Sequence, residues 1–472
     1  MTTRVDFKAL VDIWKGITFE GTASFQNEEY RRERYSLPVQ CYNWFGEQTA
    51  KLVYETTQTL STPQDVLNFK DSHQPGYLVQ ANNARYQYYS GLLKYKRTFA
   101  EVHNIDAMFG INAEKWVTKK VVTAREKFED AGIYDLNLAT GTQGNGGGKT
   151  HNGTYSYIAR LNYNYAEKYM VELMGRRDGN SKFAPGYRFK SFGSVSLGWA
   201  FSEEQFVEFL KPVLSFGKLR LSYGSSGNDV GLGDYDYVST VSLGTAGFGT
   251  IPANQVSSGF GGLISYDRTW EKVSQKNFGI DLNFFDNRLK ATFDYFIKDN
   301  TGMLVNVTYP GVLGGKAPKT NSGHLNVKGW EFTIGWRDQI KDFSYYANFN
   351  IGDTKSLLKE MEGADSYGAG WNAAVNGYPL NSYFLYRTDG YFKDQAEVDR
   401  YYALYGEGKE DLTGVGAGSA SRLRPGDTNV DLNGDYKISG AGNENSDLQY
   451  LGDSNPHFVF GFTLEDHGKV LM

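Results

Sequence analysis

Every second residue is apolar in the stretch Asn277–Phe284, which reads NFGIDLNF. Successive side chains of a β-strand point to opposite faces, so this stretch predicts a strand with one apolar and one polar face. Asp286-Asn287 then predicts a turn, and the alternation resumes from Leu289 to Ile297. Two such segments joined by a short polar turn predict an antiparallel hairpin.

The same alternation recurs along the chain in Tyr155–Tyr165, with Ile158 as an exception on the polar face, and in Trp330–Trp336 and Phe343–Ile351. Strands of roughly 9 to 11 residues or more match a tilted membrane crossing, whereas strands of globular proteins usually have about 5 or 6. The pattern therefore predicts a transmembrane antiparallel β-barrel with its apolar faces toward lipid.

The connections between these segments alternate between short and long. The short ones are 166–168, 285–288 and 338–342, and the long ones are 178–190, 224–268 and 299–324. This alternation is typical of short periplasmic turns and longer extracellular loops. One short stretch, Glu203–Leu210, could be helical.

Composition supports a membrane wall and argues against several other classes of protein. The 472 residues include 34 Tyr and 30 Phe, and Tyr and Trp suit the two membrane interfaces. A net charge of −5 gives no basic surface for nucleic acid. The longest uninterrupted apolar run, Tyr401–Tyr405, is too short for a helical span, and the single Cys41 excludes an internal disulfide. Met1 does not open a signal peptide, so we expect that the N-terminal part is missing.

No constellation in the sequence predicts catalysis, and we expect that the protein is not an enzyme. The stretch Gly144–Thr150 is similar to a phosphate loop, but the Walker spacing requires Gly where Gln143 stands, so we interpret it as a flexible loop. The adjacent carboxylates Glu203 and Glu204 are interpreted as a solvated turn. The six histidines are scattered and lack metal-ligand spacing.

A calcium site is the one cofactor that the sequence suggests. Asp431, Asn433 and Asp435 place oxygen ligands at alternate positions, which is how a calcium loop begins. Tyr436 stands where an EF-hand needs Gly, and Gly442 replaces the bidentate Glu. A turn held by its own side-chain hydrogen bonds is the alternative interpretation.

Several longer strings resemble the SusC/RagA family of TonB-linked outer-membrane proteins, in family order over about 300 residues. They are Arg176–Phe183, Ser194–Trp199 with Ser202–Glu204, Lys218–Gly224 with Gly227-Asn228, Trp270–Lys272, Asn277–Asp281, Lys328–Glu331, Arg424–Asp427 through Asp435, and Leu451–Pro456. The resemblance divides the chain into 1–150, which matches more loosely as barrel strands and loops, and 151–464, which matches strongly. Residues 465–472 do not fit the expected last strand and are expected to be an aberrant tail.

The resemblance implies an outer-membrane barrel of 22 strands with a plug domain, a SusD-like surface lipoprotein as a lid, and energy supplied through TonB. Members import glycans or peptides. Signal peptide, plug and terminal strands are expected to be absent from this chain, so TonB would act only through the missing N-terminal region. The expected partners are outer-membrane lipid, the lipoprotein and the substrate, without nucleic acid. As written, the chain is expected neither to close a barrel nor to transport.

Two other functions remain open from the sequence. One is a siderophore receptor of the same TonB-dependent class, and the other is a secreted soluble β-protein that binds carbohydrate through exposed Tyr and Trp. A β-propeller hydrolase is a third, weaker alternative, because no repeat and no paired catalytic constellation is present in the sequence. The substrate-contacting residues are unknown from sequence.

Overall fold

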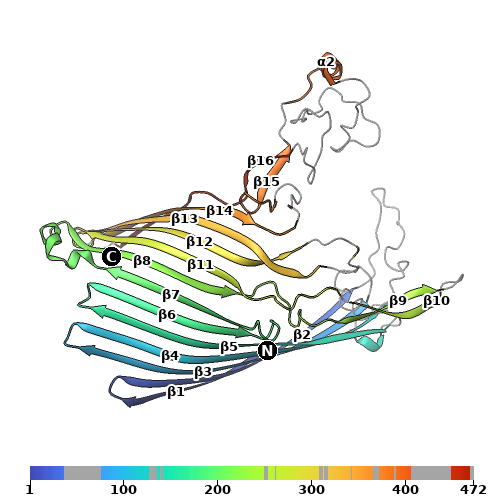
Figure 1. Ribbon diagram of the computed structural model, residues 1–472, viewed down its shortest axis with the longest axis horizontal. Helices are drawn as coiled ribbons and strands as arrows, with labels where there is room; N and C mark the ends of the chain where they lie inside the picture. Colours follow the sequence, from blue (N-terminus) through green and yellow to red (C-terminus); the bar gives the residue numbers. More distant parts are fainter. Residues whose placement is uncertain are drawn as a thin grey trace, which may run out of the picture.

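The computed structural model describes residues 1–36, 76–126, 135–138, 141, 143–248, 253–260, 262–307, 312, 317–341, 343–363, 365, 372–386, 390–405 and 448–467. Most of these residues form one curved, open antiparallel sheet (Figure 1). Its thirteen strands follow the order β1-β2-β3-β4-β5-β6-β7-β8-β11-β12-β13-β14-β17. Neighbours in the sheet are therefore neighbours in the chain, apart from two excursions that carry β9–β10 and β15–β16. The fold confirms the predicted antiparallel barrel wall.

The strands of this sheet have the following bounds: β1 Thr2–Trp14, β2 Ile17–Ser36, β3 Gly76–Phe99, β4 His103–Glu126, β5 Gln143–Tyr165, β6 Tyr169–Asn180, β7 Phe189–Trp199, β8 Leu214–Asn228, β11 Glu271–Phe284, β12 Leu289–Asn306, β13 Lys319–Ile340, β14 Phe343–Glu360 and β17 Val459–His467. β17 continues to His467, so residues 465–467, which are expected from the sequence to belong to an aberrant tail, are paired with β14 in the sheet.

The short connections lie together at one end of the sheet, on the left in Figure 1. Several are tight turns with two consecutive residues of positive φ, such as Ala166 (51°) and Glu167 (60°), closed by the Lys168 N–H donating to the Tyr165 carbonyl at 2.9 Å. This geometry is a type I′ turn, whose twist matches that of the flanking strands. We call this end the short-turn rim. A longer connection on the same rim contains the 3₁₀ helices η3 (Phe201–Glu203) and η4 (Gln205–Leu210), where a short helix is predicted.

The strands at the opposite end, the long-loop rim, extend further than the alternation predicts. β3 and β4 have 24 residues each and β5 has 23. The glycine-rich stretch Gly144–Thr150 is part of β5, so its interpretation as a flexible loop is wrong. Gly147 has a packing role there, since a Cβ at this position would lie 2.5 Å from the Lys120 carbonyl oxygen.

The predicted long connections are partly ordered as well. β12 runs to Asn306 and β13 begins at Lys319, so the connection between them is shorter than the predicted 299–324. The stretch between β8 and β11 contains the hairpin of β9 (Val241–Phe248) and β10 (Ala253–Phe260). Between β14 and β17 stand the hairpin of β15 (Ser382–Tyr386) and β16 (Leu448–Asp453) and the helix α2 (Gln395–Tyr405), all at the long-loop rim (Figure 1).

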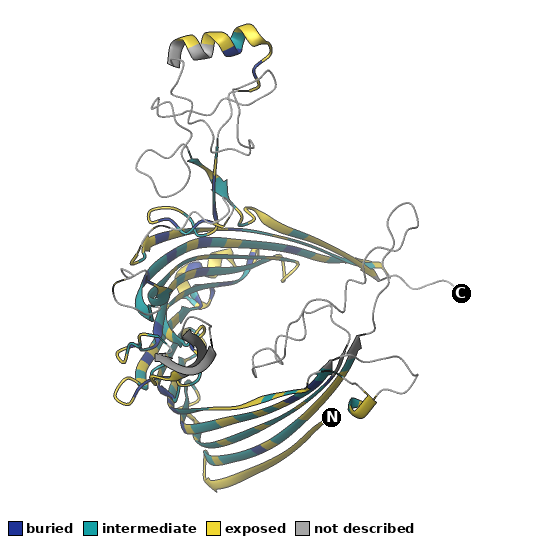
Figure 2. Cartoon of the chain, turned by 90° about the vertical axis from the view of Figure 1, so that its right-hand side faces the viewer, coloured by how far each residue is buried: buried dark blue, intermediate teal, exposed yellow. Residues whose placement is uncertain are grey.

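Apolar and polar residues alternate along each strand, and directly paired residues of neighbouring strands point to the same side. The sheet therefore has one apolar and one polar face. One row on the apolar face crosses seven strands: Trp199, Leu219, Ile280, Phe293, Phe332, Ile351 and Phe460. Large apolar residues of this face are exposed, including Leu197, Leu221 and Phe278. Figure 2 shows exposed and part-buried residues alternating along the strands.

Among the residues that the structure describes, no helix is both long enough and apolar enough to cross a membrane.

Candidate functional site: the polar face of the wall

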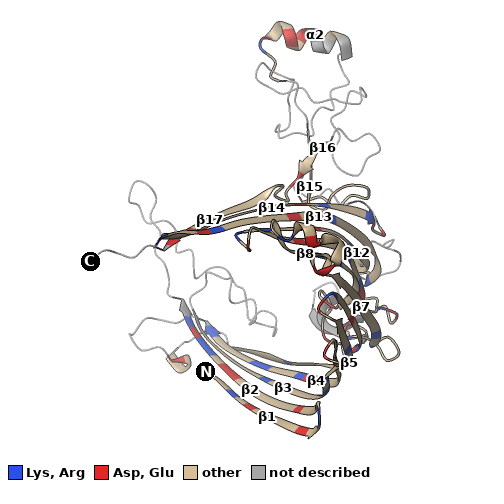
Figure 3. Cartoon of the chain, turned by 90° about the vertical axis from the view of Figure 1, so that its left-hand side faces the viewer, with Lys and Arg blue, Asp and Glu red and all other residues tan. Residues whose placement is uncertain are grey.

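Charged residues of both signs lie along the strands of the sheet (Figure 3). The most connected of them is Arg220 on β8, which bridges two neighbouring strands. Its guanidinium donates to the Asp281 carboxylate on β11 at 2.7 and 2.9 Å, and to the Asp294 carboxylate on β12 at 3.0 and 3.1 Å. Bidentate pairs of this kind combine charge with fixed geometry. The network therefore ties three strands together on the polar face.

A glycine makes this network possible. Gly279 is the direct partner of Arg220 on one side and of Asp294 on the other. A Cβ at Gly279 would lie 2.7 Å from Arg220 Cζ and 2.7 Å from Asp294 Oδ1. The guanidinium therefore lies across the backbone of β11 at the one position in the NFGID string that has no side chain.

A second charge network lies on the polar face near the other edge of the sheet. Glu20 on β2 accepts from Lys8 Nζ on β1 at 2.9 Å and from Lys94 Nζ on β3 at 2.6 Å. Here the central charge on β2 meets an opposite charge on each neighbouring strand, whereas Arg220 on β8 reaches across β11 to β12. In both networks the central charge is thus neutralised within the wall.

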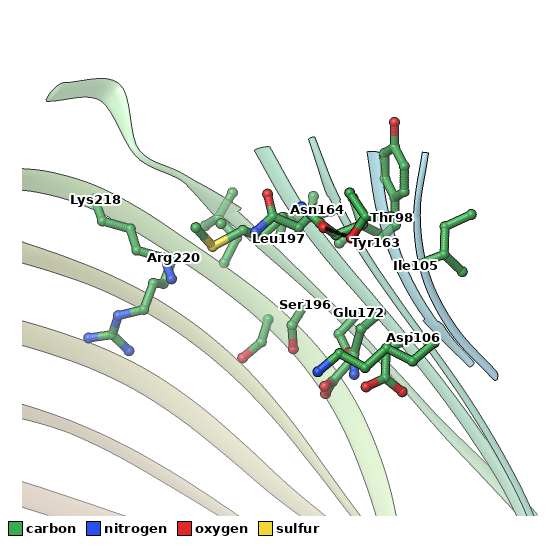
Figure 4. A pocket seen from close by; sticks show the side chains of 18 of the residues that line it. Thr98, Ile105, Asp106, Tyr163, Asn164, Glu172, Ser196, Leu197, Lys218 and Arg220 are labelled. Atoms are coloured by element: carbon green, nitrogen blue, oxygen red, sulfur yellow. Dashed lines mark hydrogen bonds between the residues drawn. The ribbon is translucent and has the colours of Figure 1, made fainter. Parts of the chain in front are cut away.

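A hollow of about 470 Å³ lies between these networks, over strands β3 to β8. Its polar-face lining includes Lys96, Asp106, Asn162, Glu172, Ser196, Lys218 and Arg220. Figure 4 shows Asp106, Glu172 and Ser196 pointing to one side of the strands, while Ile105 points to the other. The hollow can bind polar and charged groups, because donors and acceptors from six strands converge on it.

The long-loop rim carries a packed cluster, which we call the rim cluster: Phe183, Phe192, Leu232 and Trp270. Trp270 packs against Phe183 in a tilted arrangement with ring centroids 5.2 Å apart, and its indole N–H donates to the Arg188 carbonyl at 2.8 Å. The next residue, Glu271, is also buried and accepts from Asn228 Nδ2 and from the Leu304 N–H, both at 2.8 Å. The cluster fastens the loop after β6 and the stretch before β11 to the wall.

Glu203 and Glu204 differ in their surroundings, against their common interpretation as a solvated turn. The Glu204 carboxylate accepts from the Tyr169 hydroxyl at 2.5 Å and from Trp199 Nε1 at 3.2 Å. The hydrogen bond from Tyr169 and then that from Trp199 hold the pKa of Glu204 below its usual value. Glu204 thus anchors η3 and η4 to the first residue of β6 and the last residue of β7.

The predicted calcium ligands Asp431, Asn433 and Asp435 lie outside the described residues, so calcium binding remains a prediction. Within the part of the chain that the structure describes, no three His, Cys, Asp or Glu side chains gather as metal ligands would. Four histidines have side-chain partners instead: His103 contacts Tyr163, His151 contacts Tyr235, His324 contacts Asp299 and His457 contacts Asp353.

Comparison with known proteins agrees with this architecture. The family model "TonB dependent receptor-like, beta-barrel" matches residues 6–453. TonB-dependent receptor P39 of Formosa agariphila is 27% identical over 397 residues, which cover 81% of this chain and 34% of that protein. TonB-dependent receptor SusC of Bacteroides thetaiotaomicron is 28% identical over 256 residues, covering 50% of this chain and 25% of that protein.

Among solved structures, that of the RagAB peptide transporter superposes with a TM-score of 0.73 at 18% identity, covering 99% of this chain and 46% of the other. A likeness at this identity concerns the fold. The chain spans about a third of the length of the curated relatives that it matches over most of its own length.

The matched family comprises transporters and receptors of the outer membrane, which excludes the alternative of a secreted soluble β-protein. Its barrels turn their apolar face to lipid and their polar face to the lumen. The polar face described above is therefore the lumenal face of the wall, and the short-turn rim is its periplasmic end. The chain belongs to the TonB dependent receptor-like β-barrel family.

Proposed function

We propose that this chain forms the wall of an active importer that takes up glycans or peptides together with a SusD-like surface lipoprotein, with energy from TonB. The observation that carries the proposal is the lumenal face, on which polar and charged side chains from many strands border a hollow of about 470 Å³. A path for hydrated molecules needs such a lining, whereas the opposite face suits lipid.

The ordered structures of the long-loop rim support a partner at the cell surface. The β15–β16 hairpin stands beyond the sheet and is packed at its base, where Ala373, Val375 and Phe384 form a buried cluster. Tyr378 and Tyr450 flank this cluster and are partly exposed. An exposed aromatic pair on a rigid base is the kind of surface that protein interfaces use. We therefore place the lipoprotein contact at this hairpin.

Gene deletion in the native host tests the proposal. Cells that lack the gene should lose growth on one oligosaccharide or oligopeptide as sole nutrient, and the full-length gene should restore it. A tagged full-length protein should copurify with a surface lipoprotein, and Tyr450→Ala should weaken that association. A growth defect confined to iron-depleted medium would instead indicate a siderophore receptor, and unchanged growth on all nutrients would contradict import.

A further inference from the structure

Two aromatic rings pack against each other on the lumenal face near the long-loop rim. Tyr86 on β3 and Trp116 on β4 are direct partners in the sheet, with ring centroids 4.3 Å apart and ring planes 34° apart. Trp116 remains 39% exposed. A large ring that is held by a neighbour and still exposed toward a lumen is available to a ligand.

The pair lies on the extracellular side of the lipid-facing band. The residues of β4 that share the outer face are apolar from Ile105 through Ala113, and the next one, Lys115, is an exposed cation. A lysine at that position marks the end of the lipid-facing band. Trp116 therefore faces the lumen at a level that a molecule entering from outside the cell reaches before the hollow.

Planar polar side chains flank the rings in the same rows of the sheet. The row of the pair reads Arg4, Gln26, Tyr86, Trp116 and Asn152 across β1 to β5, and the adjacent row reads Asp6, Ser24, Tyr88, Glu114 and Thr154. Arg4 and Asp6 pair with each other at 2.9 Å. The rings thus lie among amides, hydroxyls and carboxylates, and Arg4, the cation of these two rows, is paired with Asp6.

This arrangement matches the chemistry of a sugar ring. One face of a pyranose carries C–H groups that pack on an aromatic ring, while its rim carries hydroxyls that both donate and accept hydrogen bonds. Amides and carboxylates satisfy such hydroxyls. A peptide that bound through its main chain would need a free strand edge. The two strands that carry the rings, β3 and β4, are paired on both sides at this level, so neither offers a peptide such an edge.

We infer that the Tyr86–Trp116 pair is a sugar-binding platform that receives a pyranose ring of a neutral oligosaccharide on its way through the lumen. The inference rests on the proposed import function and selects glycans from its two substrate classes. Trp116 supplies the exposed ring face, and Tyr86 holds the indole in place from the neighbouring strand.

Uptake by cells that carry the full-length gene tests this inference. The probes are fluorescently labelled neutral heptasaccharides of α-glucan, β-glucan, xylan and mannan, with a labelled oligopeptide mixture in parallel. Trp116→Ala should lower the uptake of the transported heptasaccharide at subsaturating concentration by about tenfold, as loss of a central aromatic contact does elsewhere. Trp116→Phe should retain most of it, because a ring remains.

The matched control is Tyr89→Ala on the neighbouring strand β3, since Tyr89 is exposed on the lipid-facing side. It should leave uptake at the parent level. The amount of folded protein in the outer membrane, measured by heat-modifiable mobility, separates loss of binding from loss of assembly.

The other outcomes overturn the inference in distinguishable ways. Heptasaccharide uptake that is unchanged in Trp116→Ala would refute the platform and leave the import function standing. Uptake of peptides without any heptasaccharide would do the same and assign the importer to peptides. A parent strain that takes up neither class of probe would overturn the proposed function itself, and the platform with it.

Discussion

The two halves of the wall use their lumenal faces differently. In β6 to β14, the Arg220 network and the rim cluster satisfy their own polar groups and bury their rings. In β2 to β5, Trp116 keeps a ring exposed to the lumen. The strings that resemble the SusC/RagA family all lie in the half from Arg176 onward. Several of them contribute residues to the Arg220 network and to the rim cluster. The comparison teaches that several recognisable strings build the scaffold of the wall, while the exposed ring of Trp116 lies where the resemblance is looser.

The largest loss of stability is expected from removing a ring of the rim cluster. Trp270 is only 8% exposed, so Trp270→Ala should destabilise the protein by about 3 to 5 kcal/mol through lost packing and a cavity. The urea midpoint of the full-length protein in lipid vesicles measures this loss. A midpoint equal to that of the parent would mean that the cluster does not fasten the rim.

The two faces of one strand provide the next largest contrast. Ile280→Arg places a charge in the lipid-facing row and should cost about 2 to 4 kcal/mol, visible as reduced assembly into the outer membrane. Asn277→Arg on the lumenal face of the same strand is the matched control and should assemble normally. Asp281 is unsuitable as the control because it binds Arg220. Equal assembly of both variants would reverse the assignment of the faces.

Removing Arg220 should have a smaller effect. Arg220→Met leaves Asp281 and Asp294 facing each other without their shared cation. Breaking a buried pair costs more, but these side chains are about a fifth to a third exposed, so solvent screening reduces the expected loss to about 1 to 3 kcal/mol. Adding Asp281→Asn and Asp294→Asn should raise the urea midpoint part of the way back to that of the parent. No recovery in the triple variant would argue against charge repulsion as the cause.

A pH-dependent contact at the outer rim should give a weaker effect. His457, in the loop before β17, lies 2.6 Å from Asp353 and 3.5 Å from Asp453. The hydrogen bond to Asp353, and then that to Asp453, raise the pKa of His457. A raised pKa means that the contact stabilises fully below the ordinary value of about 6.5 and is lost as the pH rises through the raised value.

Hydrogen exchange of the β15–β16 hairpin checks this contact. His457→Gln should speed exchange relative to the parent at pH 5.5, and the difference should shrink at pH 9. Because parent and variant are compared at each pH, the intrinsic pH dependence of exchange cancels. A difference that persisted unchanged at pH 9 would exclude protonated His457 as the cause.

The smallest effect is expected at the platform in the other half of the wall. Trp116→Ala removes an exposed ring, so the free energy of unfolding derived from the urea midpoint should change by no more than about 0.5 kcal/mol. This outcome would separate a ligand-binding residue from the scaffold residue Trp270, although both are tryptophans. A loss as large as that of Trp270→Ala would place Trp116 in the scaffold as well.

Local alternation predicts strands and faces well, since Phe278, Ile280 and Leu282 show their common face within one segment. It does not predict the partners of Arg220, because Asp281 and Asp294 lie 61 and 74 residues away and meet it only through strand pairing. Alternation also does not predict the length of β5. Its glycine-rich first part has no apolar face, since both of its faces lie in water, and such a stretch resembles a loop.

The extension of the strands beyond the lipid has a consequence for measuring where the membrane lies. A tilted crossing needs only about 9 to 11 residues, whereas β3 and β4 have 24 each. Their ladder of backbone hydrogen bonds continues unbroken into water. The amide protons there should therefore exchange as slowly as those in the bilayer. Slow amide exchange would therefore outline the paired sheet rather than the membrane. The position of the bilayer has to be taken from the outward side chains, where Ala113 gives way to Lys115.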